Sequence, residues 1–221
     1  MLGLYIGIIL LLNIPYVQHR MSVLVAKELS TVLGSELTVG RINIGLLNRI
    51  IIDDLVLNDQ SGKELLKIGR LSAKFEILPL FSGKISIGNV QLFSFNANLE
   101  RPTPQASTNF QFVLDAFASK DTVKKKSNLD LRINSLLIRR GKVSYDVLSA
   151  DSTPGKFNPQ HIRLSNILAN ISLKALQNDS VNAAIKRMSV EEEHSGFELK
   201  KLSLKIIANN RKMRIENFAI D

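Results

Sequence analysis

The sequence predicts a mainly β protein in which a long, curved antiparallel sheet forms a taco-like apolar groove, preceded by two helices and interrupted by one short helix. Three observations lead to this fold. From Glu36 onward, apolar and polar residues alternate with a period of two, as in half-buried strands. Within that region one line of apolar and small residues recurs five times. The first sixteen residues carry no charged side chain, which favours a membrane helix ahead of the sheet.

Residues 1–16 are predicted to form a transmembrane anchor. As a helix they would cover about 24 Å, somewhat less than a hydrocarbon core of about 30 Å. Tyr16 and the His19–Arg20 pair suit the interfacial end of such a helix. A cleaved signal peptide and a buried helix are the alternatives. The residues show neither the charged start nor the small-residue cleavage site that a signal peptide needs.

Residues 17–34 are predicted to form an amphipathic helix. Its apolar residues recur at spacings of three and four, and Gly34 stands where a left-handed C-cap belongs. We expect this helix to cover the end of the sheet.

The remaining chain divides into two groove segments, residues 35–100 and 129–221, joined by a linker over 101–128. The period-two pattern predicts nine strands. They are Thr38–Ile44, Ile50–Leu57, Leu65–Ile77, Lys84–Leu99, Leu129–Tyr145, His161–Leu173, Val181–Val190, Phe197–Ile207 and Met213–Ile220.

The recurring line predicts a bend in the strands that carry it. The lines begin at Ile50, Ile85, Leu131, Ile162 and Met213, and each has apolar residues at its first, third and sixth positions. The third and sixth positions of a plain strand lie on opposite faces. An extra residue at the polar or small pair in positions four and five, a β-bulge, would return all the apolar groups to one face.

The linker is predicted to carry a short helix over residues 109–118. Phe110, Val113, Leu114 and Phe117 have helical spacing, so this helix should dock on the sheet or on a membrane surface. The basic run at 124–126 follows in polar sequence, as a solvated tether or an anionic contact.

The sequence contains no constellation typical of an enzyme. It has no cysteine, its three histidines are isolated along the chain, and it lacks phosphate-binding and nucleophile motifs. Asp53 and Asp54 occupy the bend of the first line, which favours a structural role. The net charge is +9, but no basic stripe with interleaved aromatics indicates nucleic-acid binding. We therefore expect no catalytic residue, metal site, cofactor or nucleic-acid partner.

Three stretches carry a resemblance to a known family: "GSELTVGRINIGLLNRIIIDDLVLNDQSGKELLKIGRLS", "NFQFVLDAFASKD" and "LRINSLLIRRGKVSYD". The chain resembles the N-terminal portion of TamB-like proteins of the AsmA-like superfamily, in the form seen in Bacteroidota. The resemblance implies a single-pass inner-membrane protein with its bulk in the periplasm, whose groove carries phospholipid acyl chains toward the outer membrane. It also implies a partner barrel of the TamA or BamA type, through a C-terminal region that this chain lacks.

The expected function is therefore bridge-type lipid transfer. The alternatives are an assembly factor that offers a sheet edge to outer-membrane proteins, and an envelope scaffold with a filled two-layer core. The residues expected to line the groove are the apolar members of the repeats. They are Ile52, Leu55, Leu57, Ile85, Ile87, Val90, Leu92, Ile133, Leu136, Ile138, Leu164, Ile167, Ile215 and Phe218.

Overall fold

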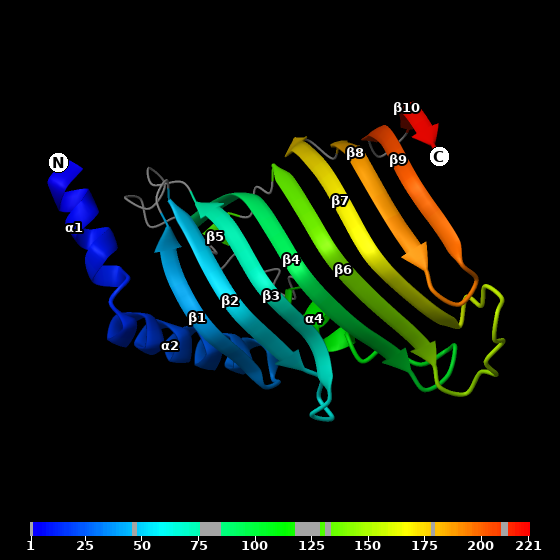
Figure 1. The fold of residues 1–221 in the computed structure, drawn as a ribbon, viewed down its shortest axis with the longest axis horizontal. Helices are drawn as coiled ribbons and strands as arrows, with labels where there is room; N and C mark the ends of the chain where they lie inside the picture. The colour runs from blue at the N-terminus through cyan, green and yellow to red at the C-terminus, as the bar shows by residue number, and fades with distance from the viewer. Residues whose placement is uncertain are drawn as a thin grey trace.

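The computed structural model describes residues 2–45, 48–75, 85–117, 129–130, 134–177, 180–208 and 212–221. It is mainly β, as the sequence predicts, with one large sheet and a few helices (Figure 1). The helices are α1 (Leu2–Leu12), α2 (Pro15–Leu33) and α4 (Gln111–Phe117). The strands are β1 (Leu37–Gly45), β2 (Arg49–Asn58), β3 (Glu64–Phe75), β4 (Ile85–Arg101), β5 (Leu129–Asp130), β6 (Ser135–Val147), β7 (His161–Gln177), β8 (Ser180–Glu192), β9 (Phe197–Ala208) and β10 (Met213–Ile220).

The sheet is mixed, so the prediction of a fully antiparallel sheet is wrong. Its order is β1-β2-β3-β4-β6-β7-β8-β9-β10, and the short β5 pairs with β4. All neighbours on this path are antiparallel except β4 and β6, which run parallel in the register Asn89↔Ser135 to Arg101↔Val147. A parallel pair requires the chain to return to its starting end by a crossover. Here the segment that carries α4 makes that return, so the predicted linker is the crossover of one continuous sheet.

The N-terminal membrane helix is also a wrong prediction. Among the described residues, no helix combines the length and apolar character needed to cross a membrane. The helix α1 has 11 residues, about 16 Å at 1.5 Å per residue, and the chain then breaks at Asn13 and Ile14. Ile14 is extended (φ −64°, ψ 131°) and Pro15 begins α2, because proline tolerates only the first turn of a helix. The expected single-pass inner-membrane location loses its support with this anchor.

The two helices α1 and α2 close the β1 edge of the sheet with side-chain hydrogen bonds. The amide of Asn13 donates to the Ile44 carbonyl at 2.8 Å. The Ser30 hydroxyl accepts from the Leu37 N–H at 2.9 Å and donates to the Leu37 carbonyl at 3.3 Å. The helix α2 ends as predicted, with Gly34 left-handed at φ 63°. The outward backbone groups at both ends of β1, those of Leu37 and the Ile44 carbonyl, are thus satisfied.

One face of the sheet is apolar, and helices cover part of it. A core of Leu33, Leu37, Leu55, Leu57, Leu65 and Ile68 lies between α2, α4 and the strands β1–β4. Phe110, Phe112 and Val113 pack against this core, so the short helix docks on the sheet. Leu114 is half-exposed, at 50%, whereas the predicted apolar stripe placed it inward. Figure 1 shows α2 and α4 behind the N-terminal strands. We call β1–β4 the covered half and β6–β10 the open half.

Candidate functional site

The apolar face extends across the whole sheet as continuous rows. One row of register partners crosses all nine strands of the path and is apolar at every position. It consists of Ile42, Ile52, Leu71, Leu92, Ile138, Ala169, Met188, Leu202 and Ile220. Paired residues in neighbouring strands share a face, so the open half continues the surface that the helices bury at the other end.

The open half leaves part of this surface accessible, although Ile167 (7% exposed) and Ala169 (3%) on β7 are buried. Helix residues pack against the core of the covered half, and no strand beyond β4 contributes to that cluster among the described residues. Leu136, Ile138 and Leu204 are only partly buried. At the far edge Ile215 is 51% and Phe218 60% exposed. An apolar surface of this extent marks a binding surface more often than an ordinary protein exterior.

The predicted lining residues are divided between the two halves. Leu55 and Leu57 are buried in the core, and Ile52, in β2, and Leu92, in β4, pack against it, so the helices already cover these positions. Ile85, Ile87 and Val90 lie in β4 at its junction with the open half, and Ile133 lies outside the described residues. The open half contains Leu136, Ile138, Leu164, Ile167, Ile215 and Phe218. Of these, Ile167 is buried, at 7% exposed.

The bends predicted by the recurring line are confirmed in three of its five copies. Asp54, Asn166 and Asn217 occupy the fifth position of their lines and have φ values of 55°, 50° and 53°. Ile52 and Leu55 flank the first bend and both contact the same core. The extra residue therefore restores the phase of the apolar side chains, as a β-bulge does.

The other two copies have their left-handed residues elsewhere. Ser94 (φ 54°) and Arg140 (φ 56°) lie further along β4 and β6. The predicted pair Gly88–Asn89 still disturbs the ladder, because the register slips between Ala73 and Phe75 on the facing strand. The apolar spacing of three between Leu92 and Phe95, in "LFSF", would have revealed the bend at Ser94.

Three of the left-handed residues lie with two glycines in a line across β1, β2, β3, β4 and β6. We call this the kink line, and it consists of Gly40, Asp54, Gly69, Ser94 and Arg140. Glycine alternates with a left-handed residue along its first four strands. A Cβ on Gly40 would lie 3.0 Å from the Asp54 Cβ, and one on Gly69 would lie 3.3 Å from the Ser94 Cβ. The glycines thus leave room for the side chains that neighbouring kinks turn sideways.

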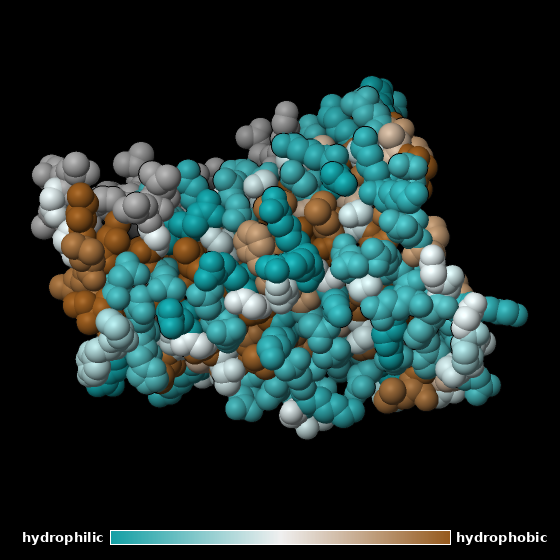
Figure 2. Space-filling model, in the orientation of Figure 1, coloured by the Kyte–Doolittle hydropathy of each residue, from teal (hydrophilic) through white to brown (hydrophobic). Residues whose placement is uncertain are grey.

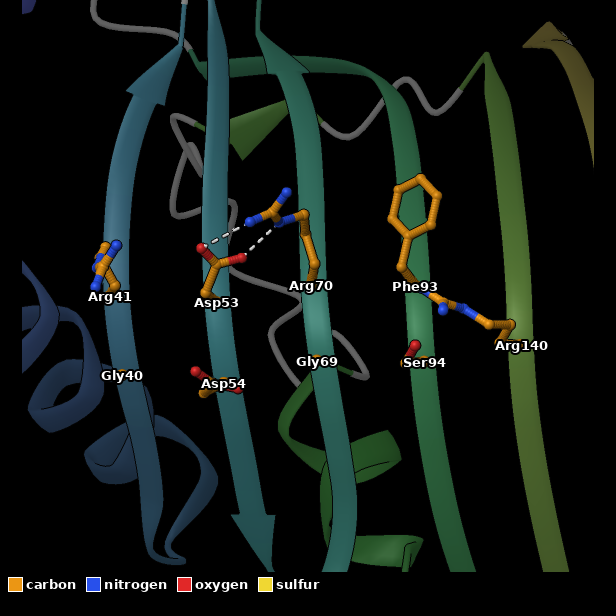
Figure 3. Close-up of a pocket in the computed structure, with 9 residues that line it drawn as sticks. All are labelled: Gly40, Arg41, Asp53, Asp54, Gly69, Arg70, Phe93, Ser94 and Arg140. Atoms are coloured by element: carbon orange, nitrogen blue, oxygen red, sulfur yellow. Dashed lines mark hydrogen bonds and ion pairs between the residues drawn. The ribbon is translucent and has the colours of Figure 1, made fainter.

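The kink line lies on the polar face, opposite the helices. Figure 2 shows this face as mostly hydrophilic. A surface cavity of ≈ 690 Å³ follows the line, and both Asp53 and Asp54 contribute to its lining (Figure 3). In a regular strand the two carboxylates would point to opposite faces, but the left-handed Asp54 keeps them together. Asp53 accepts two hydrogen bonds from Arg70, at 2.6 and 3.1 Å, so its role is structural.

His161 has partners that the sequence did not reveal. Its Nδ1 lies 2.8 Å from Asp146 Oδ1 and its Nε2 lies 3.0 Å from the Ala150 carbonyl. Arg163 binds the other oxygen of Asp146 at 2.8 Å. Because both neighbours of the ring are acceptors, both ring nitrogens donate and the imidazolium is favoured. With neither nitrogen free to take a proton, the pair does not act as a general base.

We predict that stability falls as the pH rises through the range in which His161 loses its proton. The hydrogen bond to Asp146, followed by the one to the Ala150 carbonyl, raises the pKa of His161 above its usual value. Because the pKa of His161 is higher in the folded protein, its contribution to stability is complete below about pH 6.5, the pKa of a histidine in the unfolded chain. That contribution is lost as the pH rises through the pKa of His161 in the folded protein. Urea denaturation between pH 5.5 and 9 should show this decline, and His161→Gln should flatten it. An equal decline in the variant would contradict the assignment.

Glu192, at the end of β8 before the turn into β9, is likewise a structural residue. It is 2% exposed and accepts from the Ser195 N–H at 2.7 Å and the Ser195 hydroxyl at 2.6 Å. Burial acts to raise the pKa of Glu192. The hydrogen bonds from Ser195, together with those from the backbone N–H groups of Arg163 and His194, outweigh burial and lower the pKa to about 2. The turn between β8 and β9 has Gly196 left-handed at φ 69°.

Within the part of the chain that the structure describes, no three His, Cys, Asp or Glu side chains are placed to hold a metal ion. The chain matches no protein-family model, and no curated protein is significantly similar to it. Two features of the structure are candidate functional sites. One is the accessible apolar surface of the open half, and the other is the kink line on the opposite, polar face of the sheet.

Proposed function

We propose that the protein binds lipid acyl chains on the apolar face of the open half, as part of lipid transfer. The observation that carries this proposal is the contrast between the halves. The same apolar row continues across both, and helices bury it on one side only. The resemblance to TamB-like proteins points in the same direction.

The chemistry of the surface suits an acyl chain. The row carries only hydrocarbon and thioether side chains, from Ile138 through Ala169 and Met188 to Leu202. Such a surface offers area and no directional hydrogen bonds. Burying ten methylene groups is worth about 8 kcal/mol. We therefore expect binding that depends on chain length and discriminates little between headgroups.

Photo-crosslinking at neighbouring positions of β6 tests the proposal. Leu136 and Ile138 lie on the apolar face, whereas Leu137 between them pairs with Gln91 and Asn170 on the polar face. We expect a photoreactive amino acid at position 136 or 138 to capture phospholipid in cells. The same probe at 137 is the matched control and should capture little. Mass spectrometry of the purified adducts identifies the lipid.

Two outcomes would contradict acyl-chain binding. One is the absence of a lipid adduct at both 136 and 138 in folded protein. The other is an equal yield at 137, which would indicate contact with a bilayer surface rather than binding to one face. Native mass spectrometry of protein purified without detergent gives an independent check, because a bound lipid adds its own mass.

A second candidate function is the acceptance of an additional strand at β10. The β1 edge is closed by Asn13 and Ser30, whereas β10 pairs with β9 alone among the described strands. Met213 is 69% and Ile220 61% exposed on this strand. An assembly factor could bind an extended segment there by β-augmentation. Crosslinks from residue 214 to protein rather than lipid would favour this function.

A further inference from the structure

The kink line contains two residues that are poorly suited to their backbone, Ser94 and Arg140. Left-handed φ values cost glycine little and are acceptable for Asn and Asp, but an ordinary side chain clashes with its own backbone there. Asp54 and Asn166 follow this rule, whereas Ser94 (φ 54°) and Arg140 (φ 56°) do not, and Arg140 has the larger side chain. A strained residue that persists in a folded protein is a reason to look for a function at that position.

The strain places two arginines on one face. In a regular strand Arg139 and Arg140 would point to opposite sides of the sheet, and one would enter the apolar face. The kink between Ile138 and Gly141 prevents this. Both guanidinium groups instead line one cavity of ≈ 450 Å³ on the polar face, together with Phe93 and Ser189.

Arg140 lies where this cavity meets the larger one along the kink line. It lines both cavities, as does Phe93. Figure 3 shows the Arg140 side chain reaching toward β4, beside Phe93 and Ser94. The Ser94 hydroxyl therefore provides a further hydrogen-bond donor close to the guanidinium group.

The charges of the two arginines are not balanced locally. Arg139 and Arg140 are exposed and have no ion-pair partner among the described residues. No carboxylate lines the smaller cavity. In the larger one, Asp53 is bound to Arg70, and Asp54 lies on β2, with β3 and β4 between it and Arg140. Two adjacent cations that are held together against their mutual repulsion form a site for an anion.

We propose that Arg139 and Arg140 bind a phosphate group of an anionic ligand at the kink of β6. Guanidinium groups bind phosphate oxygens through paired, charge-assisted hydrogen bonds, and Ser94 adds a neutral donor. The ligand approaches from the face opposite the helices and the apolar surface. The inference is therefore independent of acyl-chain binding, and either proposal can fail without the other.

Isothermal titration calorimetry with pyrophosphate tests the site at low ionic strength, with sodium chloride matched in both cells. We expect saturable binding that weakens at least about tenfold in Arg139→Gln and in Arg140→Asn. Asparagine tolerates the left-handed backbone, so Arg140→Asn should also raise the melting temperature. A rise in stability together with a loss of binding distinguishes a ligand site from a merely structural arginine. Lys201→Gln, an exposed position on β9, is the control of equal charge and should bind as the parent does.

Vesicle flotation distinguishes the source of the phosphate. Pyrophosphate binding without vesicle binding indicates a soluble phosphate ester. Binding to anionic vesicles but not to zwitterionic ones, lost in the same two variants, indicates a lipid headgroup. The proposal is overturned if neither probe binds saturably. It is equally overturned if Lys201→Gln lowers binding as much as the arginine variants do.

Discussion

Leu57→Asp is expected to unfold the protein, whereas Leu204→Asp is expected to leave it folded. Leu57 is 4% exposed in the core beneath the helices. Removing a buried leucine costs about 2–5 kcal/mol, and burying an unpaired carboxylate adds several more. The sum approaches the total stability of a typical domain, about 5–15 kcal/mol. Leu204 lies on the same face but in the open half, where water can reach the new carboxylate.

Circular dichroism and urea denaturation compare the two variants directly, since the chemical change is identical. Leu204→Asp should also lower the amount of co-purified lipid. If Leu204→Asp unfolds the protein as completely as Leu57→Asp does, the open half is sealed by protein. The acyl-chain proposal then loses its surface.

Gly141→Ala is expected to destabilise the protein by about 2–3 kcal/mol, at the upper end for overpacking in a core. A Cβ at this position would lie 2.3 Å from Cε1 and 2.8 Å from Cζ of Phe95. Phe95 itself packs against the core, which limits how far its ring can move. The glycine is therefore required by a neighbouring side chain on β4, not by its own backbone angles.

A double-mutant cycle with Phe95→Leu isolates this contact. In the Phe95→Leu background the added methyl group has more room, so Gly141→Ala should cost much less there. Gly45→Ala is the control, because its Cβ would meet its nearest neighbours at an ordinary 3.5 Å. An unchanged cost of Gly141→Ala in the two backgrounds would show that the strand, and not the ring, needs glycine.

The strands could be predicted from the sequence because their signal is local. The period of two places β2 and β10 within a residue of their observed ends. The bend at Asp54 could be predicted as well, since the apolar spacing changes phase around it. The parallel pairing of β4 and β6 could not, because strand direction depends on how a crossover returns in space, and the pattern within each strand is the same either way.

The errors at the N-terminus and the kink line have different origins. Hydropathy alone does not show that Pro15 starts a new helix, so an apolar run resembles one long span. The sequence shows Arg139 and Arg140 only as neighbours in a predicted strand, and only the left-handed backbone at Arg140 brings both to one face. Pairs such as His161 and Asp146 join separate strands, and no local spacing encodes their distance.

The hydrogen bonds from α1 and α2 to β1 restrict how copies of this sheet could associate. The hydrogen bonds from Asn13 and Ser30 occupy backbone groups at both ends of β1, whereas β10 pairs with β9 alone among the described strands. They therefore obstruct a head-to-tail contact, β10 of one copy against β1 of the next, which is the contact from which filaments propagate. Two copies could still meet β10 against β10 about a twofold axis. In such a pair the β10 strand of each copy would continue the sheet of the other.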